Sequence, residues 1–306
     1  MKAVRVWAVV TLMGAMHGPL AAQASLRVRV GERWVEWWRS DHAPVQWTSP
    51  DSTFMSAVHW RSSGAPIEWG DVELSGAGEA WRLKAIVVRL DPRRFRFRLA
   101  TRLGEHGSVA AWAVDSAPTG AVLAVNAGQY AGPAPWGWVV HNGAEVRPRG
   151  FGPLAVTIAF DSSGAVSFVG DSAAATLVPG AAVVEAFQSY PLLLTGAGEI
   201  PAALRRSDPL LDLEHRDSRL GLGLDRGGHL VLMLTRFNGL GGTLDRVPVG
   251  ITVPEMAAIM GALGCRTAVA LDGGISGQLL LRTADTTAVW RGWRKVPLGL
   301  VAMPRQ

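Results

Sequence analysis

The residues best suited to chemistry lie in a glycine-rich segment near the C-terminal end of the chain. Asp272 is followed by Gly273 and Gly274, and Ser276 comes two residues later. Because glycine has no side chain, a ligand can approach the backbone closely beside the carboxylate. The carboxylate could then act as a general acid or base, or could hold a sugar hydroxyl. The alternative is an Asx-turn that only ends the preceding strand.

Two further polar groups and one arginine also follow or precede apolar segments. Asn126, Gly128 and Tyr130 come after the segment 121–125, and the asparagine amide offers both a donor and an acceptor. By itself this pattern is more often a turn than a binding site. The other candidates are Gln188 and Ser189, and Arg219, which directly precedes the apolar segment 220–224.

A guanidinium at the start of a strand can bind phosphate through two parallel hydrogen bonds. For Arg219, an ion pair with Asp217 or Glu214 on the surface is the better interpretation when only the local sequence is considered.

Other kinds of catalytic site lack their motifs. The seven histidines show no H-x-x-x-H or H-E-x-x-H spacing, and there is no G-x-S-x-G motif. The segment 239–242 lacks the lysine and hydroxyl residue of a phosphate-binding loop. The single cysteine, Cys265, lies in an apolar setting and excludes both an intrachain disulfide and a cysteine-rich zinc site. We therefore expect no metal and no cofactor.

The elements that must position these residues are mostly short strands and turns. The 36 glycines and 18 prolines indicate a β-rich or mixed fold. Turn signals at Asn142-Gly143, 161–164 and 225–228 predict three hairpins. Further strands are predicted at 84–90, 94–99, 121–125 and 265–271.

One helix is predicted directly before the strand that leads to Asp272. Thr252 and Glu255 form a capping box, which makes the glutamate a structural residue, and Gly264 ends the helix. Apolar residues recur at helical spacing and predict one apolar face. They are Met256, Ile259, Met260 and Leu263.

Charge and composition restrict the partners. The net charge is +5, from 30 basic and 25 acidic residues. No basic run is interleaved with aromatic residues, so we expect no nucleic acid as a partner. A weakly basic surface suits a phosphate-bearing or acidic glycan, although it identifies no ligand. Some of the 13 tryptophans could stack on sugar rings, but most are more simply explained as core residues.

Residues 1–24 have the pattern of a signal peptide. Lys2 and Arg5 precede the apolar run 6–16, and Ala22-Gln23-Ala24 fits a cleavage site. The run is too short to span a bilayer, and no later segment has 18 uninterrupted apolar residues. We expect cleavage after Ala24, export to the periplasm or the extracellular space, and no membrane span after signal removal.

Taken in order, the motifs resemble the phosphodiester glycosidase family, over about residues 80–303. The segments that carry the resemblance are Asn126-Ala127-Gly128-Gln129-Tyr130, the hairpin from Gly137 to Gly143, Gln188-Ser189-Tyr190-Pro191, Arg219 to Gly223, Gly250 to Ala257, and Leu271 to Ser276. The N-A-G-x-Y and D-G-x-I-S variants are similar to a bacterial branch of exported proteins. The resemblance implies a mixed α/β (α+β) fold, with twisted, mainly antiparallel sheets and a few packed helices.

The family resemblance also implies an activity. The reaction is hydrolysis of the bond between the anomeric carbon of a sugar and a phosphodiester, which releases free sugar and a phosphate monoester. Asp272 would be the catalytic carboxylate, and Arg219 would hold the phosphate. The residues expected to contact substrate are Asn126, Gly128, Tyr130, Gln188, Ser189, Gly273, Gly274 and Ser276.

Three departures from the family pattern bear on the substrate. Tyr190 stands where the family usually has glycine, and is expected to narrow the pocket. Leu220 and Gly221 replace a Thr-Ala pair, and Gly277 replaces a hydroxyl residue.

Two alternative functions and the division of the chain remain open at this point. One alternative is a non-catalytic protein that binds an envelope glycan or exopolysaccharide; the other is a phosphodiesterase that releases a sugar phosphate. We divide the chain into the signal peptide, a tryptophan-rich segment 25–80 and a phosphodiester glycosidase-like domain over 81–306. The segment 25–80 is either a small appended unit or additional strands of the same sheet.

Overall fold

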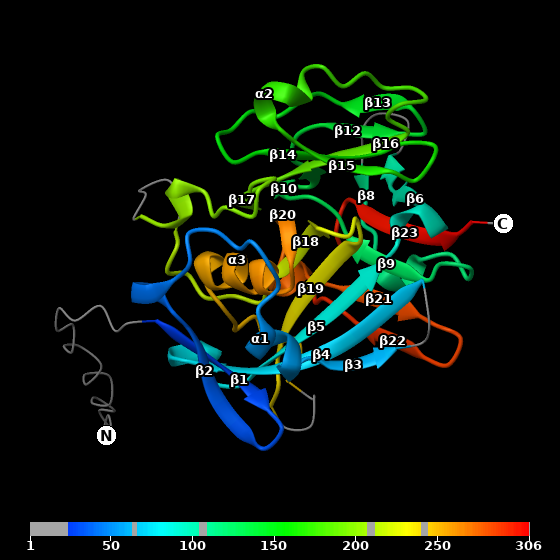
Figure 1. The fold of residues 1–306 in the computed structure, drawn as a ribbon. Helices are drawn as coiled ribbons and strands as arrows, with labels where there is room; N and C mark the ends of the chain where they lie inside the picture. The colour runs from blue at the N-terminus through cyan, green and yellow to red at the C-terminus, as the bar shows by residue number, and fades with distance from the viewer. Residues whose placement is uncertain (1–23, 63–65, 104–108, 207–211, 240–243, 306) are drawn as a thin grey trace, which may run out of the picture.

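The computed structural model describes residues 24–62, 66–103, 109–206, 212–239 and 244–305 (Figure 1). The predicted signal peptide lies outside these residues, apart from Ala24. The strands form antiparallel sheets, and the α-helices are few and short. The prediction of antiparallel sheets with few helices is confirmed. The expected α/β mixture is wrong in its balance, since the fold is mainly β.

The largest sheet has nine strands and carries the elements on which the polar candidates depend. Its order is β17-β20-β18-β19-β5-β4-β1-β2, with β3 also paired to β4. The strands are β1 (Ser25–Val30), β2 (Arg33–Arg39), β3 (His59–Ser62), β4 (Ile67–Gly76), β5 (Leu83–Leu90), β17 (Leu192–Leu194), β18 (Leu220–Asp225), β19 (Leu230–Phe237) and β20 (Cys265–Leu271).

Two five-stranded sheets complete most of the fold. One has the order β22-β21-β9-β23-β6 and the other β13-β12-β16-β14-β15. The first contains β6 (Phe95–Ala100), β9 (Leu123–Asn126), β21 (Leu279–Arg282), β22 (Thr287–Trp290) and β23 (Gly299–Pro304). The second contains β12 (Val139–His141), β13 (Ala144–Arg147), β14 (Val156–Phe160), β15 (Val166–Gly170) and β16 (Glu185–Ser189). Two small ribbons pair β7 (Arg102–Leu103) with β8 (Val109–Ala110), and β10 (Tyr130–Ala131) with β11 (Ala134–Pro135).

The three predicted hairpins are confirmed as β12–β13, β14–β15 and β18–β19. In the first, Asn142 and Gly143 both have positive φ, at 52° and 75°. This is the backbone that a two-residue hairpin turn requires, and the Asn-Gly pair tolerates it. Turn chemistry was therefore a reliable guide to local pairing.

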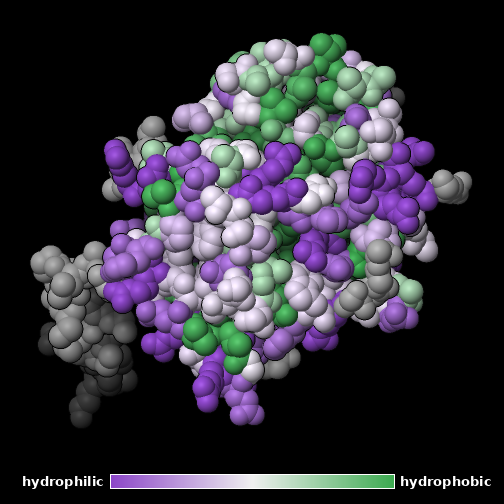
Figure 2. Space-filling model, viewed as in Figure 1, coloured by the Kyte–Doolittle hydropathy of each residue, from purple (hydrophilic) through white to green (hydrophobic). Residues whose placement is uncertain are grey.

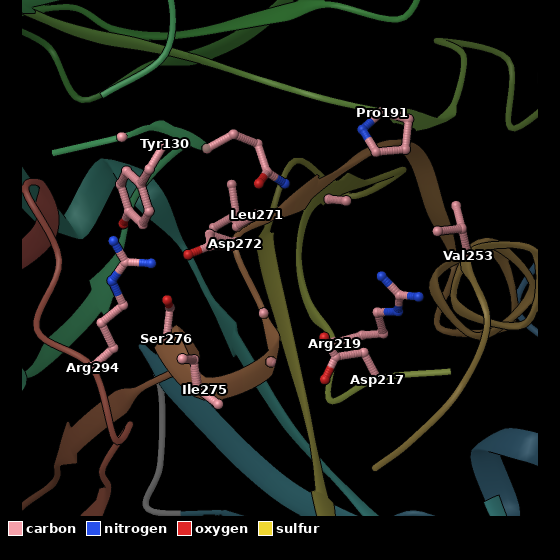
Figure 3. Close-up of a pocket in the computed structure, with 15 residues that line it drawn as sticks. Tyr130, Pro191, Asp217, Arg219, Val253, Leu271, Asp272, Ile275, Ser276 and Arg294 are labelled. Atoms are coloured by element: carbon pink, nitrogen blue, oxygen red, sulfur yellow. The ribbon is translucent and has the colours of Figure 1, made fainter. Parts of the chain in front are cut away.

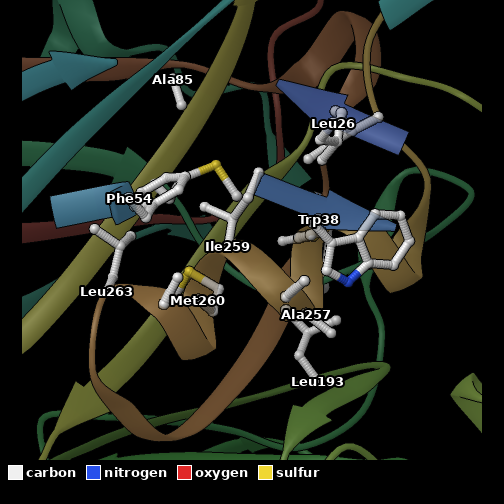
Figure 4. Packing of buried hydrophobic residues seen from close by; sticks show 14 of the residues in the cluster. Leu26, Trp38, Phe54, Ala85, Leu193, Ala257, Ile259, Met260 and Leu263 are labelled. Carbon is white, nitrogen blue, oxygen red and sulfur yellow. The ribbon is translucent and has the colours of Figure 1, made fainter. Parts of the chain in front are cut away.

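Two hydrophobic cores lie on opposite faces of the nine-stranded sheet. One core is shared with the two five-stranded sheets and includes Ile86, Phe97, Leu123, Ile158 and Val269. The other lies under the helices α1 (Ser52–Ala57) and α3 (Val253–Ala262) (Figure 4). The central strands are apolar on both faces because each face is covered. The third helix, α2 (Asp171–Ala174), packs on β14 and β15.

The predicted helix is confirmed as α3, with its capping box, but the prediction of one apolar face is wrong. The Thr252 side chain accepts a hydrogen bond from the Glu255 amide, and Glu255 accepts one from the Thr252 amide. Every residue from Glu255 to Ala262 is buried. Small residues fill the faces between the larger apolar ones, which lets α3 be enclosed on several sides.

The tryptophan-rich segment takes part in this enclosure. Strands β1 to β4 belong to the nine-stranded sheet, and β4 pairs along its length with β5. Trp38 and Phe54 lie in the core that contains α3, as Figure 4 shows. Structurally, these residues continue the sheet of the following part of the chain. Within the described residues, no helix is long and apolar enough to cross a bilayer.

Trp47 packs so closely on α3 that it dictates glycine at position 261. A Cβ built at Gly261 would lie 2.2 Å from Cδ1 of Trp47. Alanine is normally better than glycine inside a helix by about 1 kcal/mol. Here we expect Gly261→Ala to lower the free energy of unfolding by about 1–3 kcal/mol, because the indole must move. Denaturant titration measures the change.

The control for this prediction reduces the indole. Trp47→Leu combined with Gly261→Ala should lose less than the sum of the two single changes, since the smaller side chain leaves room for the new methyl group. A Gly261→Ala protein more stable than the original would contradict the packing argument.

Candidate functional site

A pocket of about 340 Å³ lies at the edge of the nine-stranded sheet where β20 ends and β18 begins (Figure 3). Leu220 of β18 is paired with Leu271 of β20 in an antiparallel register. The residue before one strand and the residue after the other therefore meet at the same edge. This places Arg219 and Asp272 in the wall of one pocket, although they are far apart in the sequence.

A network of hydrogen bonds fixes the backbone of the Asp272 loop from below. The Asn126 side chain donates to the Asp272 carbonyl at 2.6 Å and accepts from the Gln278 amide at 2.9 Å. The Asp272 amide donates to the Gly128 carbonyl at 2.9 Å. The Asn126 side chain is fully buried, so its own groups depend on these two partners rather than on water. The carboxylate is thereby held at one place in the pocket.

The surroundings of the Asp272 carboxylate favour its protonated form. Burial raises its pKa above the ordinary value of 3.8, and the negative charge of Asp217 acts in the same direction. A hydrogen bond from Ser276 and the positive charge of Arg294 oppose the rise. A raised pKa is common among carboxyl groups that lie in a pocket and accept or donate protons in catalysis.

Arg219 lies in the opposite wall, anchored by backbone carbonyls. Its Nε donates to the Ile251 carbonyl at 2.9 Å, and its Nη2 donates to the carbonyl of His215. Burial lowers the pKa of this guanidinium from its ordinary value of 12.5, and the negative charge of Asp217 partly restores it. The charge of Asp217 therefore acts on Arg219, as the interpretation of a charge pair expects, while the guanidinium itself lines the pocket.

Asp217 is a second carboxylate that lines the pocket and that we did not predict as a site residue. Asp217 and Arg219 lie two positions apart in extended chain, and so point to the same side. Ser218 between them is fully buried and donates from Oγ to the Thr235 carbonyl at 2.6 Å. The alternation of residues before β18 was the signal that could have identified Asp217.

Arg294 is a second cation that reasoning from the sequence did not place in the site. Figure 3 shows Asp272 between Arg294 on one side and Arg219 on the other. The backbone amides of Trp293 and Arg294 donate to the Ile275 carbonyl at 2.8 and 3.0 Å. These bonds bring the segment before β23 to the Asp272 loop. No local feature of the sequence predicts this approach.

The glycines after Asp272 are required by the protein itself rather than by a ligand. A Cβ at Gly273 would lie 2.2 Å from the Ser218 carbonyl oxygen, and Gly274 has a φ of +53°. The Gly274 amide donates to the same Ser218 carbonyl at 2.6 Å. Both glycines line the pocket, but their first role is to let the loop lie against the segment before β18.

Of the predicted site residues, six line the pocket and four lie outside it. The six are Asp272, Arg219, Tyr130, Gly273, Gly274 and Ser276. The four that the structure places elsewhere are Asn126, Gly128, Gln188 and Ser189. Their side chains or backbone hold strands and loops together, as the following contacts show.

Gln188 and Ser189 form hydrogen bonds inside the protein. The Gln188 Oε1 accepts from the Trp138 and Gly150 amides at 2.6 and 2.8 Å. The Ser189 Oγ donates to the Ala270 carbonyl at 2.5 Å. Both side chains are buried, because β16 is an inner strand of its sheet. From sequence alone, buried polar residues that brace the fold look the same as residues that bind a ligand.

Tyr130 and Tyr190 also differ from expectation. The Tyr130 hydroxyl donates to the Leu298 carbonyl at 3.2 Å, and burial together with the charge of Asp272 raises its pKa well above 10. The Tyr190 ring is not part of the pocket wall; it packs edge-on against Trp136, with ring centroids 4.7 Å apart. The pocket is therefore not narrowed by this ring.

Two other predicted roles can be compared with the structure. Glu255 is fully buried and forms two hydrogen bonds with Arg216, at 2.7 and 2.9 Å, in addition to its capping bonds. Cys265 is fully buried, and burial raises the pKa of its thiol. Among the described residues, no three His, Cys, Asp or Glu side chains are grouped as a metal site requires.

The raised pKa of Asp272 predicts how stability changes with pH. The folded chain binds this proton more tightly than the unfolded chain, so this contribution to stability is complete below the ordinary pKa and is lost as pH rises through the folded pKa. Asp272→Asn should therefore be more stable than the original protein at pH 7, by on the order of 1 kcal/mol, with no gain near pH 3. Urea unfolding at several pH values measures this.

Asp115→Asn is the matched control. The Arg291 guanidinium holds the pKa of the Asp115 carboxyl below its ordinary value, so the sign is reversed. This variant should be less stable than the original at pH 7, with the loss disappearing as pH falls. Identical pH profiles for both variants would contradict the assignment of a raised pKa to Asp272.

The Asn126 network predicts a second effect on stability. Asn126→Ala leaves a buried carbonyl and a buried amide without partners, which should lower the free energy of unfolding by about 2–4 kcal/mol. Gln129→Ala is the control, because the Gln129 side chain donates one exposed bond to the Tyr190 carbonyl and should change stability by less than about 0.5 kcal/mol. Thermal and denaturant unfolding measure both variants. An equal loss of stability in Asn126→Ala and Gln129→Ala would contradict the proposed role of Asn126.

Comparison with solved structures supports the fold. The catalytic domain of zebrafish N-acetylglucosamine-1-phosphodiester alpha-N-acetylglucosaminidase, auto-inhibited by its pro-peptide, superposes with a TM-score of 0.59 at 17% identity. The match covers 87% of this chain and 92% of that chain. At this identity the likeness concerns the fold.

Two further solved structures have lower scores. A hypothetical protein from Synechocystis has a TM-score of 0.48 at 16% identity, covering 92% of this chain and 68% of that chain. A putative exported protein from Burkholderia pseudomallei K96243 also has 0.48 at 16% identity, covering 76% and 77%. No curated protein sequence matches the chain.

The sequence profile of the phosphodiester glycosidase family matches residues 119–303, which is more than half of the chain. This range contains Asp272, Asp217, Arg219 and Arg294, and the family resemblance inferred from the ordered motifs is confirmed. The chain belongs to the phosphodiester glycosidase family.

Proposed function

We propose that this protein is an exported hydrolase of sugar-1-phosphodiesters. It cleaves the bond between the anomeric carbon and the phosphate oxygen, and releases free sugar and a phosphate monoester. The observation that carries the proposal is the arrangement of Asp272 between two arginines in a pocket of the family's fold. The N-terminal pattern of residues 1–24 supports export, and the motif variants support a bacterial branch of exported proteins.

The two arginines suit the phosphate. Arg219 is anchored by carbonyls that orient the guanidinium without neutralising its charge. Arg294 is exposed and can reach an anion in the mouth of the pocket. Charged hydrogen bonds to phosphate oxygens are strong and directional, and they become stronger as negative charge develops on the leaving group. Together the two groups stabilise the departing phosphate monoester.

Asp272 acts on the water that attacks the anomeric carbon. The carboxylate takes a proton from the water as the new C–O bond forms, and the electron pair of the breaking C–O bond leaves with the phosphate. Because the phosphate monoester is already a good leaving group, it needs no strong general acid, unlike the leaving group of an ordinary glycoside. Asp217 supplies a second negative charge, which stabilises the positive charge that develops on the sugar ring.

Hydrolysis of a panel of sugar-1-phosphodiesters, including nucleotide sugars, tests the proposal. We expect free sugar as the product, identified by mass, and a loss of at least 10³-fold in kcat for Asp272→Asn, whose amide cannot accept the proton. Arg219→Gln should raise KM and lower kcat, since the phosphate is held in both states. The rate should fall at acidic pH as Asp272 becomes protonated, at a pH above its ordinary pKa.

Other products would change the assignment. Sugar 1-phosphate in place of free sugar would identify cleavage of the P–O bond. Unchanged turnover in Asp272→Asn would contradict the role of this carboxylate. Saturable glycan binding without turnover would favour the alternative of a non-catalytic binding protein. The exposed Tyr190 ring and its partner Trp136 lie next to the pocket residues Gln129 and Pro191 and offer aromatic surface for such binding.

A further inference from the structure

We propose that a second groove, lined by arginines, binds the phosphate-bearing glycan chain to which the reacting sugar phosphodiester belongs. The identity of this ligand rests on the proposed function. The groove has a volume of about 760 Å³ and is separate from the pocket that contains Asp272. Among the described residues that line the groove, four are arginines and none is acidic. They are Arg93, Arg94, Arg282 and Arg305.

Most of this positive charge is not neutralised by the protein. Arg93 is paired with Asp91, at 2.9 Å. Within the described residues, no ion pair with a carboxylate is found for Arg94, Arg282 or Arg305. An anion entering the groove therefore meets at least three cations whose charge is still available.

Two of these cations are held in place by backbone carbonyls. The Arg282 Nη1 donates to the carbonyls of Pro118 and Ala121, at 2.8 and 3.1 Å. Arg305 donates from Nε to the Phe95 carbonyl at 3.0 Å, and from Nη2 to the Ser162 carbonyl at 2.8 Å. Carbonyl oxygens are uncharged, so they orient the guanidinium groups without neutralising the positive charge. Because their side chains are already ordered, binding an anion costs less conformational entropy.

The charge extends beyond the groove along β6. Arg96 and Arg98 alternate with buried Phe95 and Phe97, so both point away from the core. Residues two apart on one face of a strand are roughly 6.6 Å apart. Figure 2 shows hydrophilic side chains gathered over β6 and the end of β23. A row of cations of this length suits a ligand with repeated phosphates better than a single small anion.

The groove and the pocket lie at opposite ends of the same strands. Val122, directly before β9, lines the groove, whereas Asn126, at the end of β9, holds the Asp272 loop. In the same way, Gln278, directly before β21, lies beside that loop, and Arg282, the last residue of β21, lines the groove. Four residues of strand span ~13 Å. The groove and the pocket are therefore separated by about the length of one short strand.

The lining favours a sugar-phosphate chain over a nucleic acid. Phe95, the one aromatic residue in the described lining of the groove, is 2% exposed and offers no face for a base to stack on. Thr119 and Thr283 add hydroxyl groups that can bond sugar or phosphate oxygens. Charge and hydroxyl groups recognise a polyanion through its phosphates and its sugars.

The test measures binding of a phosphomannan to the Asp272→Asn protein, which is expected not to hydrolyse the bound ligand. Dephosphorylated mannan and a DNA duplex are the comparison ligands. The variant is Arg94→Glu with Arg96→Glu, and the matched control is Arg27→Glu with Arg33→Glu, two exposed arginines on β1 and β2. Circular dichroism verifies that both variants are folded.

We expect the Arg94/Arg96 variant to bind phosphomannan at least tenfold more weakly, the control to remain within twofold, and added salt to weaken binding. Equal affinity of the Arg94/Arg96 variant and the original would overturn the proposal, as would equal binding of dephosphorylated mannan. Tighter binding of DNA than of phosphomannan would replace the glycan with a nucleic acid. Hydrolysis of small sugar-1-phosphodiesters by the Arg94/Arg96 variant tests the pocket separately and should be unchanged.

Discussion

The arrangement of the site depends on one buried asparagine. Asn126 ends β9 and joins the carbonyl of Asp272 to the amide of Gln278, so that both ends of the glycine-rich loop are attached to the same side chain. Because the asparagine is fully buried, each of these bonds forms in a medium of low dielectric, where an unpaired partner would be costly. These bonds restrain the backbone of the loop, and so help to position the carboxylate relative to the arginines on either side.

The groups around Asp272 act on its pKa in opposite directions, and burial has the largest effect. Burial and Asp217 favour the protonated group, whereas Ser276 and Arg294 favour the carboxylate. A bound phosphate would add negative charge near the two arginines and change this balance again. A carboxyl that sits between opposing influences is suited to accept a proton during a reaction and to release it afterwards.

The two sides of the nine-stranded sheet support this site in different ways. On one face, α3 packs on β17 and β20, and the N-terminal strands and Trp47 enclose that helix. On the other face, the core shared with the five-stranded sheets holds β9 beneath the loop. The strand that leads to Asp272 is thus fixed from both sides. The tryptophan-rich segment contributes to the site through this packing, although none of its described residues lines the pocket.

The sequence by itself determined the local elements and the principal carboxylate. Turn residues such as Asn142-Gly143 and the capping box at Thr252 act over a few residues, and so can be identified without knowledge of the fold. The ordered motifs also indicated the family, and placed Asp272 and Arg219 among the candidates. Tertiary structure alone decided which polar residues face the pocket. Gln188 and Asn126 satisfy buried backbone groups, and Arg294 reaches Asp272 through bonds between distant loops. The chemistry of an amide or a guanidinium is the same whether its partner is a ligand or the protein, so only the fold could distinguish these roles.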